Sequence, residues 1–290
     1  MTPSNPFDLT PEQRRQIEQA TAAISSLAAD AVDRAFEADS KISETTYSIA
    51  ESYRRSLEPA MEGLREAARN AHQQILAAYP PNWPATLTLD LHLIDEIGTV
   101  DGIPIVYVPR AEIVEELIVA TTSQKRFEVI DARGDDIVED CDKALSAATH
   151  ADLNDGPDLT MAAIKAYRDG HYEAAQTLAV AVCDTYLKAE FERNGRGYGK
   201  ITESIEAEID EREVFYDALR IALPLGPAIR FLERWQGGGA TNAPNQLNRH
   251  VTSHFATRDH LHRRNATIAI MLASSLSVTL NVIWNTSGTP

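Results

Sequence analysis

Hydrophobic residues follow a helical spacing along most of the chain. In the N-terminal part, Ile17, Ile24, Leu27, Ala31 and Ala35 recur at intervals of three, four or seven residues among Glu, Arg and Gln. Thr10 followed by Pro11 is a typical helix start, with a capping side chain and a proline in the first turn. The pattern predicts helix over residues 10–78.

The helical pattern breaks at the segment YPPNWP, residues 79–84, because its prolines cannot continue a helix. The sequences TLTLDLHLI and GIPIVYVP that follow are partly alternating and rich in β-branched residues. We therefore expect an extended segment at about 80–109, with one or two short strands or a pinned arm. Helices are predicted next at 110–120 and 134–149, where Gly134 marks the start of the second.

The run Asp155-Gly156-Pro157-Asp158 is the clearest break in the middle of the chain. It places a domain boundary near 150–157, between a helical N-terminal region of unknown role, 1–150, and a helical bundle, 157–290. The fold class is therefore mainly α. The helices expected in the bundle are 158–168, 170–192, 202–221, 227–236, 244–256 and 264–284, with a loop at 194–199 and a flexible hinge at the triple glycine 237–239.

Residues 266–284 carry no charge, and this length of apolar helix would span a bilayer. However, Ser274, Ser277 and Asn281 recur at helical spacing and would form one polar edge. Such an edge favours a helix buried in a soluble bundle or in a subunit interface over a membrane span. The N-terminus lacks the apolar core of a signal peptide, and two cysteines cannot form a disulfide scaffold, so we expect a cytoplasmic protein.

Charge changes the functional picture. The 290 residues carry a formal charge of −16, which argues against broad non-specific binding to nucleic acid or to anionic membranes. Within residues 228–264, however, six arginines face only Glu233 and Asp259, and four of the eight histidines of the chain lie in the same window. The arginines are Arg230, Arg234, Arg249, Arg258, Arg263 and Arg264, and the histidines are His250, His254, His260 and His262.

The sequence RHVTSH in this window places Arg249, His250 and His254 on one predicted helix. An arginine can bind two phosphate oxygens at once, and a histidine can accept or donate a proton near neutral pH. Together they suffice to cleave RNA without a metal or other cofactor. His254 would take the proton of the ribose 2′-OH, and Arg249 would stabilise the charge that develops on the phosphoryl oxygens.

The spacing within this helix bears on how such a site is built. Five residues at about 100° each put Arg249 and His254 roughly 140° apart, whereas His250 and His254 share a face. A long arginine can swing towards the histidine, or two copies of the chain can complete the site. We therefore expect a homodimer whose two motif helices meet near the two-fold axis.

An Arg-polar-x-x-x-His motif followed by a final apolar helix resembles the HEPN superfamily, and here it reads LNRHVTSHF before NATIAIMLASSL. The resemblance covers residues 157–290. It implies a helical bundle, commonly dimeric, that acts as a metal-independent endoribonuclease in toxin–antitoxin, phage-defence or RNA-processing systems. Arg249 and His254 would then be catalytic, with His250 at the polar position. An RNA substrate and an antitoxin or defence-system partner are the expected partners, and no membrane is.

Two other interpretations stay open on the sequence alone. The domain could be a catalytically inactive interaction or regulatory protein, or the histidine pair His250 and His254, with His260 and His262, could bind zinc. Outside this window, the acidic run at residues 135–142 is interpreted as a solvated helix face. Trp83 and Trp235 are interpreted as packing anchors in preference to base-stacking platforms.

Overall fold

The chain divides into two compact units, Met1–Ala77 and Ala78–Pro290. The computed structural model describes residues 55, 58–59, 62–63 and 65–66 of the first unit, and 79–84, 87, 90–193, 223–235 and 244–287 of the second. The described part is mainly α, as predicted, and contains no β-strand. The predicted helices 10–78 and 202–221, the loop 194–199 and the hinge 237–239 lie outside or almost wholly outside the described residues.

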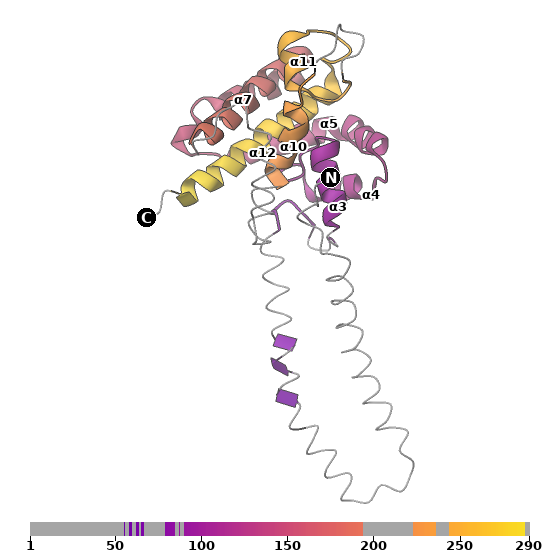
Figure 1. Cartoon of the computed structure of the whole chain (residues 1–290), viewed down its shortest axis with the longest axis vertical. Helices are drawn as coiled ribbons and strands as arrows, with labels where there is room; N and C mark the ends of the chain where they lie inside the picture. Colours follow the sequence, from indigo (N-terminus) through magenta and orange to yellow (C-terminus); the bar gives the residue numbers. More distant parts are fainter. Residues whose placement is uncertain are drawn as a thin grey trace, which may run out of the picture. The chain divides into compact units, whose positions relative to one another are not determined.

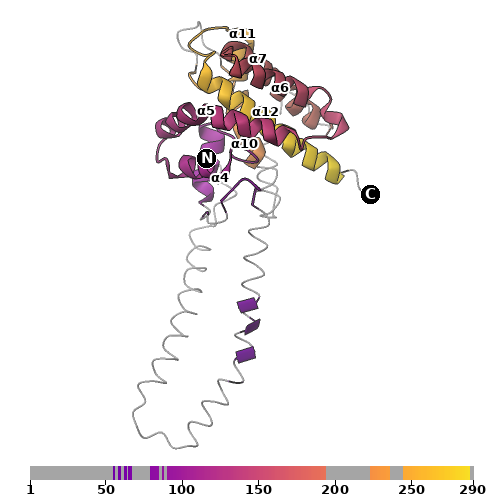
Figure 2. The ribbon, with the colours of Figure 1, turned by 180° about the vertical axis from the view of Figure 1, so that it is seen from behind.

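The second unit is built around its last helix, α12 (Arg263–Ser287). Helices α5 (Ser123–Leu145), α6 (Gly156–Arg168), α7 (Tyr172–Arg193) and α10 (Leu223–Leu232) all pack against it, as Figures 1 and 2 show from opposite sides. Between Ala266 and Leu280 every residue of α12 is buried. This helix is therefore the core of the fold.

The predicted polar edge of α12 serves this packing. Ser277 donates to the Tyr186 hydroxyl at 3.2 Å, and Asn281 accepts the backbone N–H groups of Thr149 and His150. Helix α12 is long and apolar enough to cross a membrane by length and composition, but 78% of its most apolar window is buried inside the protein. The prediction of a helix buried among others is confirmed.

The expected break at Gly134 does not occur, because α5 runs without interruption from Ser123 to Leu145. The glycine serves close packing instead. A Cβ atom at Gly134 would lie 2.6 Å from the Tyr167 hydroxyl and 3.1 Å from Nη2 of Arg263. Real side chains do not approach so closely, so the absence of a side chain lets α6 and α12 come close to α5.

The segment before α5 is only partly extended. Residues that alternate in the sequence form α3 (Leu91–Asp95) and the π-helical turn η1 (Glu96–Val100), where strands were expected. Residues 101–110 have no regular secondary structure and are held in place by side chains, which agrees with the alternative expectation of a pinned arm. The side chains of Trp83 and Asn82 donate to the carbonyl of Ile105 at 2.6 and 3.0 Å, respectively. The next helix, α4 (Ala111–Val119), matches its predicted range.

A buried ion pair ties this segment to α5. Arg126 is fully buried, contacts the carboxylates of Asp101 and Glu96, and donates to the carbonyl of Ala120 at 3.0 Å. Breaking such a pair leaves an uncompensated buried charge, which typically costs about 3–5 kcal/mol. Residues 96–120 are therefore fastened to the same core as the helices that follow.

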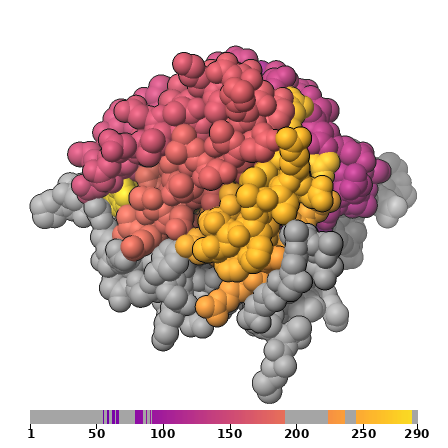
Figure 3. Space-filling view, turned by 90° about the horizontal axis from the view of Figure 1, so that it is seen from above, coloured from indigo at the N-terminus to yellow at the C-terminus, as the bar shows by residue number. Residues whose placement is uncertain are grey.

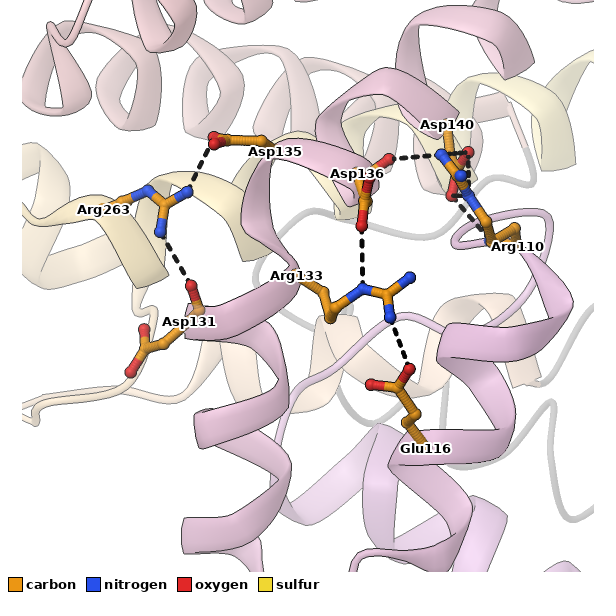
Figure 4. Close-up of polar contacts among 8 residues, drawn as sticks. All are labelled: Arg110, Glu116, Asp131, Arg133, Asp135, Asp136, Asp140 and Arg263. Carbon is orange, nitrogen blue, oxygen red and sulfur yellow. Dashed lines mark hydrogen bonds and ion pairs between the residues drawn. The ribbon is translucent and has the colours of Figure 1, made fainter.

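The acidic run of α5 is only in part the solvated face that the sequence predicted, because Asp135 and Glu139 are exposed whereas Asp140 is half-buried in an ion pair. Arg263 of α12 donates to the Asp131 carbonyl and to the Asp135 carboxylate, each at 2.8 Å, and Arg110 binds Asp140 (Figure 4). Because α5 packs on α12, the expected boundary near 150–157 falls inside the second unit. The division of the chain lies at Ala77–Ala78.

Candidate functional site

The motif helix α11 is short. It runs from Arg249 to His254, although the sequence predicted helix over 244–256. Asn248 caps it, because its side-chain Oδ1 accepts the N–H of Val251 at 3.0 Å while its Nδ2 donates to the carbonyl of Glu233. The cap fixes Arg249 as the first residue of the helix.

A buried polar chain anchors α11 to its surroundings. Gln176 of α7 donates to the Thr252 hydroxyl at 3.1 Å, and Thr252 lies 3.0 Å from Nε2 of His260. The other ring nitrogen, Nδ1, lies 3.0 Å from the carbonyl of Pro244, which can only accept, so Nδ1 carries the proton. Burial lowers the pKa of His260, which keeps the ring neutral. The hydrogen-bonded series Gln176, Thr252 and His260 therefore fixes the position and orientation of α11 on the bundle.

Arg249 points towards α7. Its guanidinium forms an ion pair with Asp184, with Nε 2.5 Å from Oδ1 and Nη2 3.1 Å from Oδ2. Both side chains are close to 30% exposed, so the pair lies at the surface where α7 adjoins residues 244–262 (Figure 3). Asp184 has no motif around it in the sequence, and only the packing of α11 on α7 identifies it.

His250 and His254 come together on one face of α11, as their spacing predicted. Their ring centroids lie 4.8 Å apart, and His254 is exposed while His250 is half-buried. The pKa of His250 is lowered, first by burial and then by the nearby charges of His254, Arg249 and Arg234. At pH 7 this ring is therefore neutral and able to accept a proton.

Folding neutralises most of the basic window. Of its six arginines, four form ion pairs with carboxylates: Arg230 with Glu233, Arg249 with Asp184, Arg263 with Asp135, and Arg264 with Asp131. Three of these carboxylates belong to α5 and α7, outside the window. The positive charge that the sequence concentrates in residues 228–264 is thus mostly used to attach α11 and α12 to the bundle.

Two aromatic rings lie beside the histidines. Trp235 and Phe255 meet edge to face with centroids 4.5 Å apart, and Phe255 lies 6.1 Å from His250. Trp235 follows α10 in the chain and reaches α11 because Asn248 holds the Glu233 carbonyl. The sequence gives no spacing signal for this cluster, since 20 residues separate its two members.

The four histidines of the zinc interpretation do not converge. Both ring nitrogens of His260 are engaged by Thr252 and Pro244, and Nδ1 of His262 accepts the N–H of Asn265 near the start of α12. Within the described ranges, no three His, Cys, Asp or Glu side chains are grouped as ligands of one metal ion. The histidines thus divide into a surface pair and two that support the structure.

No protein-family model matches the chain, and comparisons with curated proteins and with solved structures also found no match.

Proposed function

We propose that this protein is a metal-independent endoribonuclease of the HEPN type, with its active site at Arg249, His250 and His254. The observation that carries the proposal is the pair of adjacent imidazoles at the surface of α11, one of them held neutral, beside an arginine fixed by a neighbouring helix. These are the groups that cleavage through the 2′-OH requires.

The chemistry needs two proton transfers. One base removes the proton of the 2′-OH, whose oxygen then attacks the adjacent phosphorus, and the bond from phosphorus to the 5′-oxygen breaks as that oxygen takes up a proton. The lowered pKa of His250 suits it to accept the first proton, and the exposed His254 supplies the second. The sequence alone gave the first role to His254. Arg249 stabilises the charge on the non-bridging oxygens.

Asp184 gives Arg249 its position before RNA arrives. A guanidinium that already has a fixed direction loses less side-chain entropy when it binds a phosphate. The same carboxylate competes with the phosphate for the guanidinium, so binding must loosen or share the ion pair. Asp184 is thus a positioning residue in this proposal, and it lies on α7, far from the motif in the sequence.

The homodimer is also a proposal, and it needs a different interface from the one the sequence suggested. The apolar surface of α12 is used inside the chain. Helix α7, however, presents a stripe of small or apolar side chains to solvent: Ala174, Leu178, Ala181, Thr185 and Ala189. Leu159, 43% exposed, extends this stripe across a hollow of about 240 Å³ between α6 and α7. Light scattering at micromolar concentration tests this, with Ala181→Glu expected to give a monomer.

A non-enzymatic role is the second candidate, and one observation favours it. The contacts that Asn248, Arg249 and Thr252 make with the described residues also have a structural purpose, since they hold the end of α10, α7 and His260 in place. In that case the RHVTSH segment would be a docking element of an interaction or regulatory protein, and the histidine pair would have no catalytic role.

Incubation of the purified protein with a mixed RNA pool in EDTA separates the two candidates. The endoribonuclease predicts fragments with 2′,3′-cyclic phosphate ends, because a 2′-OH nucleophile leaves that product, and it predicts no cleavage of DNA. Absence of cleavage would favour the interaction protein. Cleavage only after addition of zinc would contradict the metal-independent mechanism.

A further inference from the structure

Four aromatic rings form a continuous row across the candidate site. In order they are Trp235, Phe255, His250 and His254, with centroid separations of 4.5, 6.1 and 4.8 Å. The first two rings are half-buried, His250 is half-buried and His254 is exposed. The row therefore joins an apolar aromatic pair directly to the two groups that would move protons.

A positive charge lies beside the same row. Arg234 is exposed, directly precedes Trp235 in the chain, and is close enough to act on the charge of His250. No ion pair joins Arg234 to a carboxylate among the described residues, in contrast to Arg230, Arg249, Arg263 and Arg264. Rings for bases and a cation for the backbone are the two elements that single-stranded nucleic acid needs in a binding surface.

The structure of the other tryptophans shows that Trp235 is differently placed. Trp83 is 6% exposed with its Nε1 bonded to the Ile105 carbonyl, and Trp284 is 4% exposed with its Nε1 bonded to Glu190. Both are packing residues, as the sequence analysis expected of Trp83. Trp235, which the sequence analysis also interpreted as a packing anchor, follows the last turn of α10, is half-buried, and packs edge to face on Phe255 at the edge of the site.

We propose that Trp235 and Phe255 form a stacking platform for an unpaired base of single-stranded RNA, next to the phosphate that Arg249 and the histidine pair attack. This rests on the proposed function and specifies its substrate class. The base stacks on the face of Trp235, which Phe255 supports edge to face, the backbone passes Arg234, and the next phosphate reaches the histidines. A base inside a duplex is already stacked between its neighbours, so double-stranded RNA of the same sequence is not a substrate.

The experiment uses intrinsic fluorescence, because the chain has only three tryptophans and two are buried. The probe is a single-stranded 2′-O-methyl RNA oligonucleotide, which has the bases of RNA but no 2′-OH to react. We expect saturable quenching of the wild-type protein and none with the same oligonucleotide in a duplex. His171→Ala, which removes an exposed histidine outside the site, should bind the probe like the wild type.

The matched variants are Trp235→Leu and Trp235→Phe, with binding followed by the polarisation of a labelled probe. Loss of one base–aromatic stack predicts affinity about 5- to 150-fold weaker for Trp235→Leu, whereas Trp235→Phe keeps a ring and most of the affinity. Circular dichroism confirms that each variant is folded. If Trp235→Leu does not fold, the presence or absence of quenching of the wild-type protein by the probe decides whether the platform exists.

The outcomes distinguish the platform from the proposed function. Saturable quenching that depends on Trp235 supports the platform even if the protein cuts no RNA, in which case only the catalytic proposal fails. Absence of quenching in the wild type, or unchanged binding and cleavage by a folded Trp235→Leu variant, overturns the platform. Cleavage of natural RNA by that same variant would leave the catalytic proposal standing.

Discussion

Asp184 of α7 binds Arg249 of α11, and the 2.5 Å between Oδ1 and Nε makes this the contact that orients the candidate catalytic arginine. The two residues are 65 positions apart in the chain. The pair explains how an arginine at the start of a six-residue helix can have a fixed direction at a partly exposed surface. In the absence of RNA, Asp184 therefore partly neutralises the charge of Arg249, to which a phosphate would bind.

Replacing Asp184 with Asn should strengthen RNA binding at low salt. The substitution removes the negative charge that competes with phosphate for Arg249, while its amide can still contact the guanidinium. We expect a lower Kd for single-stranded RNA. The slope of log affinity against log salt concentration should also become steeper by about one released counterion. Polarisation of a labelled, uncleavable oligonucleotide at several salt concentrations measures both quantities.

Asp142→Asn is the matched control, because Asp142 pairs with Arg168 between α5 and α6, away from the motif helix. It removes the same charge from the same protein. Equal effects of the two substitutions on binding would show that only net charge matters and that Asp184 has no specific role.

The pH dependence of cleavage should report the lowered pKa of His250. Protonated His250 cannot accept the proton of the 2′-OH, so the rate should fall as the pH decreases through a pKa below 6.5, the ordinary value. Measurement of kcat/KM between pH 5 and 8 gives this acidic limb for the free enzyme. A limb centred at or above 6.5, or one that persists in His250→Gln, would assign the base to another group.

Stability should also decrease in acid, through His260. Burial lowers the pKa of this ring in the folded protein, so the unfolded chain binds a proton near pH 6.5 that the folded chain does not. Unfolding is therefore favoured as the pH falls through that range, and His250 and His262, whose pKa values are also lowered, act in the same direction.

The variant His260→Gln tests this contribution by urea unfolding. At pH 7.5 it should lose about 1–3 kcal/mol, because the bonds to Thr252 and Pro244 are no longer satisfied together. Between pH 7.5 and 5.5 it should lose less additional stability than the wild type. An identical pH dependence in the two proteins would exclude His260 as a source of the acid sensitivity.

Fragments should reveal where the chain divides. Residues 78–290 form one compact unit, so this fragment should fold and melt cooperatively. The fragment 157–290 lacks α5, so it would expose the face of α12 that α5 covers. Arg263 and Arg264 would also lose the α5 carboxylates with which they form ion pairs. Circular dichroism and limited proteolysis should therefore find this shorter fragment unfolded. A cooperative melt of 157–290 would support the boundary that the sequence suggested.

Periodicity and composition in the sequence were sufficient to predict several of the helices that pack into the core. Helices α4, α6, α7 and α12 lie within a few residues of their predicted ranges, and the serines of α12 correctly indicated burial among other helices. Local signals failed where tertiary contacts override them. Gly134 looked like a break and is a close-packing position, and the alternating residues before Gly102 became α3 and η1.

The site was predictable only where its geometry is local. Four-residue spacing is enough to bring His250 and His254 together on one helix. Asp184 and Trp235 were not predictable, because they reach α11 through packing between distant segments, and neither position differs from an ordinary helix or loop residue in the sequence. The boundary expected near 150–157 falls inside the second compact unit, because Asp155-Gly156-Pro157 resembles a linker in the sequence but leads into α6, which packs on the same core.

The measurement that tests the central claim most directly is single-turnover cleavage of one single-stranded RNA in EDTA by matched variants. We predict cleavage by the wild type and by His171→Ala, an exposed histidine outside the site, and rates lower by about 10²–10³ for Arg249→Ala and His254→Ala with folding intact. Wild-type rates for both Arg249→Ala and His254→Ala would contradict the assignment of the active site to α11.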